Sequence, residues 1–147
     1  MRLAGPRSFI ELDVLDYEFP ASSPLAADRN TLLVLLRLGW HQNISTRSVP
    51  VLLTWELDQL TRWLEQLLQT HRPPPRLQFT EPCFGIECLS CTRDEYLLQI
   101  HLAHEAAPDW HHEPGVPFWL PILTPRGQIE SAVYTLQQQS EKFPVRP

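Results

Sequence analysis

The chain has 147 residues, of which 43% are hydrophobic and 20% charged, and its formal net charge at pH 7 is −5. This length fits one domain spanning residues 1–147, and folding should bury roughly 70% of the unfolded surface, so stability requires no metal, disulfide or cofactor. The negative charge disfavours direct nucleic-acid binding, and the sequence contains no phosphate-cradling glycine loop, dinucleotide fingerprint or Gly-x-Ser-x-Gly elbow.

The first third of the chain predicts three strands. Ser8 to Phe19 alternates in polarity as a half-buried strand does, and Pro20 to Asn30, rich in Ala, Ser and Pro, predicts a loop. Thr31 to Trp40 is almost continuously apolar, which is typical of a central strand covered on both faces. A return strand is expected from Ser45 to Leu53.

A change in the spacing of the apolar residues predicts two helices. The segment from Glu56 to His71 carries one apolar stripe, with Thr54 as its expected N-cap. A second helix should begin at Thr124, with Pro125 at the first helical position. The stripes consist of Leu57, Leu60, Leu64, Leu67 and Leu68 in the first helix and of Ile129, Ala132, Val133 and Leu136 in the second.

Between the helices lies a predicted β-hairpin with the three-residue loop Thr92-Arg93-Asp94. Its apolar face would pair Ser90 with Tyr96, Cys88 with Leu98, Ile86 with Ile100 and Phe84 with Leu102; Glu87, Gln99 and His101 would form its polar face. A further short strand could run from Phe118 to Ile122. The expected fold is α+β: an antiparallel sheet of five to six strands with two helices packed on one side.

No secretion signal is expected near the start, because four carboxylates between Glu11 and Glu18 interrupt every apolar run there. The longest uncharged apolar run, Leu32 to Leu36, is far shorter than the ~20 residues that span a bilayer. A cytoplasmic protein with free thiols is therefore predicted.

The cysteines form the sharpest formal motif, Cys83-x4-Cys88-x2-Cys91, which matches the first three positions of a plant-type iron-sulfur spacing. A fourth cysteine is missing. Moreover, Cys88 and Cys91 lie three apart on a predicted strand, so their side chains should point to opposite faces and could not converge on a metal. Cys88 is expected to fill space in the core.

A histidine-rich stretch provides the alternative function: a metal-binding protein or a metal-dependent hydrolase. The spacing argues against this, because His101 and His104 differ in strand parity and no pair of histidines lies four apart on a helix with an intervening glutamate. The residues that could supply ligands are His101, His104, His111, His112, Glu105, Asp109 and Glu113.

Negative charge is concentrated between Glu81 and Glu113, where seven carboxylates face a single base, Arg93. Such a concentration indicates a docking surface for a basic partner. Trp110, close to several of these carboxylates, could be an exposed hot spot of a protein interface. It could equally fold back as a lid over the apolar face of the hairpin.

Several short motifs together resemble the WapI family of bacterial immunity proteins. They are Leu53-Thr54-Trp55-Glu56-Leu57 with Leu60 and Trp63-Leu64-Glu65, then Phe79-Thr80-Glu81-Pro82, Glu105 to Trp110, and Phe143-Pro144. The sequence departs from the family pattern at Cys83 and at His111-His112. The resemblance implies a small cytosolic protein that binds the toxic C-terminal domain of a contact-delivered protein, typically an RNA-cleaving nuclease.

The sequence therefore predicts a non-enzymatic immunity-type protein that neutralises a cognate toxin with a basic surface, without binding nucleic acid or membrane itself. Its carboxylates would mimic the charge of phosphate and accelerate encounter. An interaction protein with no toxin partner is a third possibility. The oligomeric state stays open, since Leu89 and Leu97 could form a dimer contact or lie beneath the second helix. The expected partner contacts are Glu81, Glu87, Asp109, Trp110 and Glu113.

Overall fold

The computed structural model describes residues 1–113 and 115–147. Its elements, in chain order, are β1 (Arg2–Ala4), β2 (Ser8–Tyr17), α1 (Ala26–Asn30), β3 (Thr31–Trp40), β4 (Asn43–Leu53), α2 (Thr54–Thr70), β5 (Leu77–Gln78), β6 (Phe84–Cys91), β7 (Glu95–Leu102), the 3-10 turn η1 (His104–Ala106), β8 (Phe118–Pro125) and α3 (Arg126–Lys142). None of the helices in these residues combines the length and apolarity that crossing a membrane requires.

The strands form two antiparallel sheets of four strands each, not the single sheet of five to six strands that we expected. The first sheet has the order β1-β2-β3-β4 and the second the order β5-β6-β7-β8. Helix α2 separates β4 from β5 in the chain, so the polypeptide leaves the first sheet before it starts the second. Because each sheet has one apolar face, both faces are buried when the sheets pack against each other.

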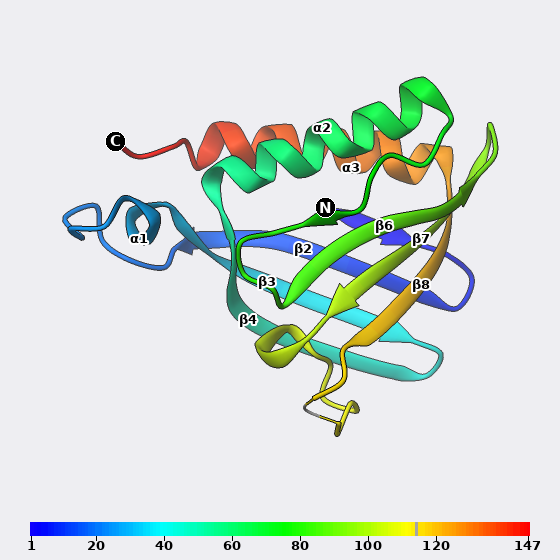
Figure 1. Cartoon of the computed structure of the whole chain (residues 1–147), viewed down its shortest axis with the longest axis horizontal. Coiled ribbons are helices and arrows are strands. Elements are labelled where there is room, and N and C mark those ends of the chain that lie inside the picture. Colours follow the sequence, from blue (N-terminus) through cyan, green and yellow to red (C-terminus); the bar gives the residue numbers. More distant parts are fainter. Residues whose placement is uncertain (114) are drawn as a thin grey trace.

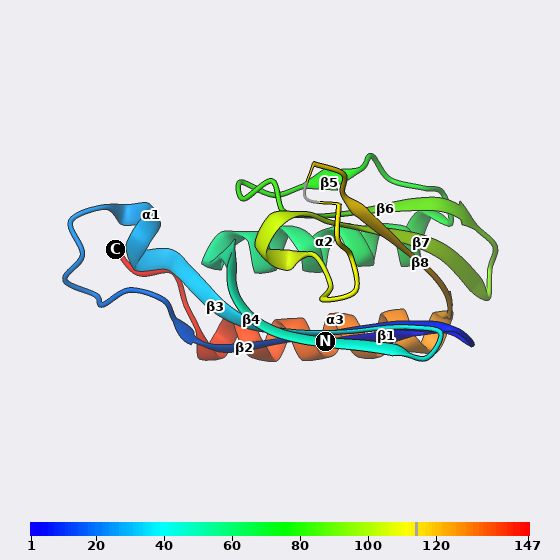
Figure 2. The same cartoon turned by 90° about the horizontal axis from the view of Figure 1, so that it is seen from below.

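The two sheets lie one over the other, and their strands cross in projection (Figure 1 and Figure 2). Helices α2 and α3 pack on each other along one side of this pair of sheets, and η1 with the residues after it lies at the opposite side (Figure 1). The α+β class is confirmed, but the helices flank the two sheets instead of covering one face of a single sheet. Buried side chains from both sheets and both long helices form one hydrophobic cluster.

Strand β3 occupies the predicted residues but is buried on one face only. Leu32 and Val34 are fully buried and Leu36 is 2% exposed, whereas the alternate residues Leu33 and Leu35 are half-buried on the outer face. The expectation of cover on both faces was wrong, because the second sheet packs against one side of β3 and no helix in residues 1–113 and 115–147 lies on the other (Figure 2). The outward apolar side chains of β3 are therefore only half-buried and do not indicate a second core.

The hairpin of β6 and β7 confirms three of the four predicted pairs and the loop Thr92-Arg93-Asp94. Phe84 pairs with Leu102, Ile86 with Ile100 and Cys88 with Leu98. The fourth pair was wrong: a bulge after Cys88 makes Ser90 pair with Leu97 and Cys91 with Tyr96. The bulge leaves Leu89 50% exposed, so the second helix does not cover it.

The helix starts differ from the predicted caps. Thr54 lies inside α2, and its hydroxyl donates to Asn30 Oδ1 at 2.9 Å instead of capping the helix. The buried Glu56 carboxylate accepts from the backbone N–H of Leu53 at 2.8 Å. Helix α3 begins at Arg126, after β8 has continued through Pro125. The short elements β1, β5 and α1 were not predicted, because two to five residues carry too little periodicity to reveal them.

Candidate functional site

The segment from His104 to Glu113, called here the 104–113 loop, is held to both sheets. At its base, the backbone N–H of Ala103 donates to the carbonyl oxygen of Cys83, at the start of the β6–β7 hairpin, at 2.9 Å. Ala106 and Pro108 are buried, and the N–H of His111 donates back to the Pro108 carbonyl at 3.0 Å. The loop is therefore a compact surface feature built on the edge of two sheets.

Asp109 ties the loop to β4 in the first sheet. Its carboxylate oxygen Oδ1 lies 2.9 Å from Nε of Arg47 and 2.7 Å from a terminal guanidinium nitrogen of the same side chain. The backbone N–H of Asp109 also donates to the hydroxyl of Ser45 at 3.1 Å. Asp109, one of the predicted partner contacts, is thus already in an ion pair with an arginine that lies 62 residues away in sequence.

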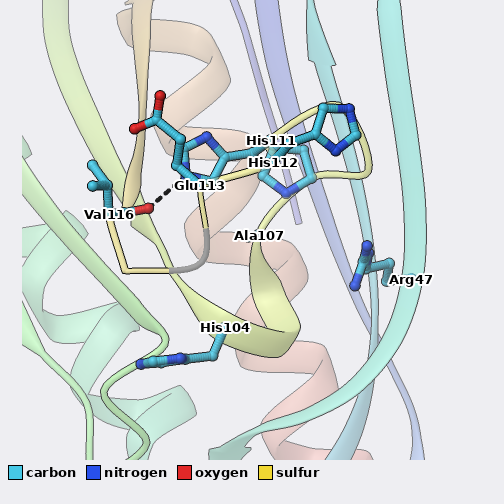
Figure 3. A pocket seen from close by; sticks show the side chains of 8 residues that line it. Arg47, His104, Ala107, His111, His112, Glu113 and Val116 are labelled. Atoms are coloured by element: carbon cyan, nitrogen blue, oxygen red, sulfur yellow. Dashed lines mark hydrogen bonds between the residues drawn. The ribbon is translucent and has the colours of Figure 1, made fainter.

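A hollow of about 340 Å³ lies between this loop and β4. Figure 3 shows Arg47 reaching from β4 on one side, and His111, His112 and Glu113 from the loop on another. His104, the first residue of η1, also lines the hollow, but its side chain points away from the other two histidines (Figure 3). The remaining lining comes from Ala107, Pro108 and Val116.

The histidines do not assemble into a metal centre in the part of the chain that the structure describes. No group of three His, Cys, Asp or Glu side chains in those residues has the arrangement to hold an ion. His111 is instead hydrogen-bonded through Nε2 to the Val116 carbonyl. Its ring also packs on that of Phe118, with 5.8 Å between ring centroids. The geometry gives His111 a role in shaping the loop.

Glu81 and Glu105 both lie near Cys83, at the base of the 104–113 loop. Burial and the negative charge of Glu81, with smaller contributions from Glu105 and Glu56, raise the pKa of the Cys83 thiol to about 11. Glu81 and Glu105 are exposed, whereas Glu56 is only 2% exposed. This end of the second sheet is therefore negative at its surface.

Glu87 lies half-buried in the middle of β6, opposite Gln99, on the outer face of the second sheet. The predicted polar face is confirmed there: Glu87, Gln99 and His101 are half-buried, and they alternate along their strands with residues whose side chains face the core. Arg76 and His101 sit beside Trp119 on the same face: the guanidinium carbon is 4.8 Å from the Trp119 ring centroid, and the His101 ring centroid is also 4.8 Å away.

Burial, and to a smaller extent the charges of Arg76 and His104, lower the pKa of His101. His101 therefore stays neutral at neutral pH and stacks as an uncharged ring. Sequence reasoning did not identify Arg76 as a neighbour of Trp119, because Arg76 comes from the segment between α2 and β5 and nothing local signals the contact.

Trp110 is half-buried against the core, with its ring 5.7 Å from that of Phe118 in an edge-on arrangement. Its indole nitrogen is buried and has no hydrogen-bond acceptor among the described residues. A buried N–H group without an acceptor lowers the stability of the fold. An acceptor on a bound partner would pair with this N–H if the indole ring turned slightly outward. Glu113, nearby in the loop, is exposed.

The carboxylates predicted as one group separate in the structure. Asp94 and Glu95 lie at the tip of the β6–β7 hairpin, at the end of the second sheet opposite to Glu81 and the 104–113 loop (Figure 1). The turn of this hairpin lies one full strand length away from the start of β6 and the end of β7, where the loop is attached. The structure brings Asp109, Trp110 and Glu113 together in one loop, with Glu81 at its base and Glu87 along the strand.

We expect Arg47→Ala to loosen the 104–113 loop without unfolding the protein. Both partners of the Arg47–Asp109 pair are substantially exposed, so the free energy of unfolding should fall by less than about 1 kcal/mol. Amide hydrogen exchange should accelerate in the loop but not in β6 or β7. The matched control is Arg62→Ala, an exposed arginine of α2 with no ion pair among the described residues. If amide hydrogen exchange in the loop were unchanged, the Arg47–Asp109 ion pair would not be what holds the loop in place.

The model of the Immunity protein WapI-like family matches residues 2–144 of the chain. No curated protein matches it, and no solved structure does. The family match covers both sheets and all of α2 and α3, and so includes every element that positions the 104–113 loop.

Proposed function

The chain belongs to the WapI-like immunity protein family, and from this membership we propose that it binds and neutralises a cognate bacterial toxin domain. It acts by binding alone, without catalysis and without a cofactor. The toxin would enter the bacterial cytoplasm by contact delivery, so we place the protein in that compartment. The family match is the observation that carries the proposal.

We propose the 104–113 loop and the outer face of the second sheet as the toxin-binding surface. Two features support this choice. The base of the loop holds the exposed carboxylates of Glu81 and Glu105, and Glu113 extends from its far end. Trp110 belongs to the same loop and is half-buried, with its indole N–H unpaired in the described residues. A tryptophan in a loop that carries carboxylates fits a partner that presents basic side chains around an apolar centre.

A nuclease domain is the toxin class that this charge pattern fits best. Its substrate-binding groove must be positive to hold phosphate, and carboxylates on an inhibitor compete for the same groove. Opposite charges also steer the two proteins together before contact, which raises the association rate more than it lowers the dissociation rate. The salt dependence of association should therefore be steep.

Charge reversal at Glu87 and Glu113 tests this surface. Asp109 is unsuitable, because its reversal would also break the Arg47 pair. The probe would be a toxin domain encoded directly beside this chain, and the association rate is measured by stopped-flow fluorescence at low ionic strength. The double variant Glu87→Lys with Glu113→Lys should associate about tenfold more slowly, with an unchanged melting temperature.

The control is the double variant Glu18→Lys with Glu141→Lys, two exposed carboxylates that lie just after β2 and near the end of α3, away from the 104–113 loop (Figure 1). It makes the same change of sign at each substituted site and should leave the association rate close to that of the native protein. If the control slowed association equally, net charge alone would explain the effect. If the native protein formed no complex with the toxin domain, the proposed function would be refuted.

A further inference from the structure

Cys88 and Cys91 lie on the same face of β6, although three residues separate them. The bulge after Cys88 inserts one extra residue into β6, so Cys88 pairs with Leu98 and Cys91 pairs with Tyr96. Leu98 and Tyr96 are two apart on β7 and both are fully buried. The sequence-based expectation that the two cysteines point to opposite faces was therefore wrong.

The two thiols are also close to one another. The Cys88 thiol donates to the carbonyl oxygen of Ser90 at 3.3 Å, which turns it along the strand toward Cys91. Burial, the largest cause, and the neighbouring Cys91 side chain together raise the pKa of Cys88 to about 12. Cys88 is 8% exposed, whereas Cys91 is half-buried, next to exposed Ser90 and Thr92.

We propose that Cys88 and Cys91 form an intrachain disulfide when the protein meets a peroxide. The more accessible Cys91 reacts first: its sulfur takes an oxygen from hydrogen peroxide to give a sulfenic acid and one water. The Cys88 sulfur then attacks the Cys91 sulfur, the S–S bond forms, and a second water leaves. Overall, two thiols lose two hydrogen atoms and one peroxide becomes two waters.

Cys83 takes no part in this pair. It precedes β6 by one residue and lies near Glu81 and Glu105, at the end of the strand away from the hairpin tip. Its side chain is 4% exposed, so a peroxide reaches it poorly.

The disulfide would act on the bulge itself. Residues 88 to 91 hold the one irregularity of the β6–β7 ladder, and this irregularity turns Leu89 toward solvent. A covalent bond across it would fix the bulge and the hairpin tip that follows. The redox state of the pair would thus change the mobility of this tip, independently of whether the protein binds a toxin.

The test is mass spectrometry of the full-length reduced protein after treatment with an equimolar amount of hydrogen peroxide at low protein concentration. The intact mass should fall by two hydrogen atoms, and iodoacetamide should then label a single thiol. Chymotryptic cleavage after Phe84 separates Cys83 from the other two cysteines, so peptide mapping identifies the bonded pair directly.

Cys83→Ser should retain the loss of two hydrogens, and Cys91→Ser should abolish it. A bond from Cys83 to either other cysteine would overturn the proposal. So would a native protein that only gains oxygen, or keeps three labelled thiols, at peroxide concentrations that oxidise a control peptide of residues 85–93. Because the mapping uses the native chain, the result does not depend on how well either variant folds.

Discussion

Replacing Glu56 with alanine is expected to lower the free energy of unfolding by about 2–5 kcal/mol, as measured by urea denaturation. The Glu56 carboxylate is 2% exposed and accepts two backbone hydrogen bonds. One oxygen accepts from the N–H of Leu53 at 2.8 Å, and the other accepts from the N–H of Thr80 at 2.7 Å. Alanine would leave the buried N–H of Leu53 and the partly buried N–H of Thr80 without this acceptor.

The two bonds connect the end of the first sheet to the segment that leads into β6. Glu56 therefore both caps α2 and joins the two halves of the fold. The matched control is Gln59→Ala, an exposed residue one turn later in α2, which should change stability by less than about 0.5 kcal/mol. Equal denaturation midpoints for the two variants would refute this role for Glu56. Glu56→Gln, which keeps one acceptor oxygen, should fall between them.

Gly5→Ala is expected to destabilise the protein by about 1–3 kcal/mol or more, because two strands of different sheets meet at this glycine. A Cβ atom at Gly5 would lie 2.2 Å from the carbonyl oxygen of Leu123 and 3.1 Å from its carbonyl carbon. Both are backbone atoms of β8, so no side-chain rotation relieves the clash. The turn that joins β1 to β2 would have to move away from β8.

Gly127→Ala is the control for this prediction. A Cβ there meets no heavy atom within 4 Å, and the position lies in the first turn of α3. Alanine should therefore stabilise the helix by up to about 1 kcal/mol. Thermal or urea unfolding of both variants should give shifts of opposite sign. Destabilisation by both substitutions to the same extent would show that backbone freedom, not the β1–β8 contact, is decisive.

Much of the secondary structure follows from local patterns. Thr31–Trp40 was predicted to the residue, and α2 and the hairpin loop 92–94 were placed to within about two residues, because apolar periodicity and turn residues act over a few positions. The same patterns suggested one sheet. Each strand carries one apolar face, but nothing in the strand states which other strands share its hydrogen bonds or which sheet its face covers.

The candidate site shows the same division. The concentration of carboxylates, Trp110 and the resemblance to the immunity family are properties of the sequence, and the family is confirmed. The pairing of Asp109 with Arg47 could not be predicted, since 62 residues lie between them and an isolated arginine in a strand gives no signal. The separation of Asp94 and Glu95 from the other carboxylates likewise depends on the length of the hairpin, not on the charges.

The sequence by itself determined where the longer helices and strands form, which apolar stripe of each long helix faces the core, and to which family the chain belongs, because these depend on patterns along the chain. Only the tertiary structure decided that the strands divide into two sheets and that Glu56 links them. It also decided that one bulged residue brings Cys88 and Cys91 to the same face. These features depend on hydrogen bonds and packing between segments far apart in sequence, whose energies appear only when the chain is folded.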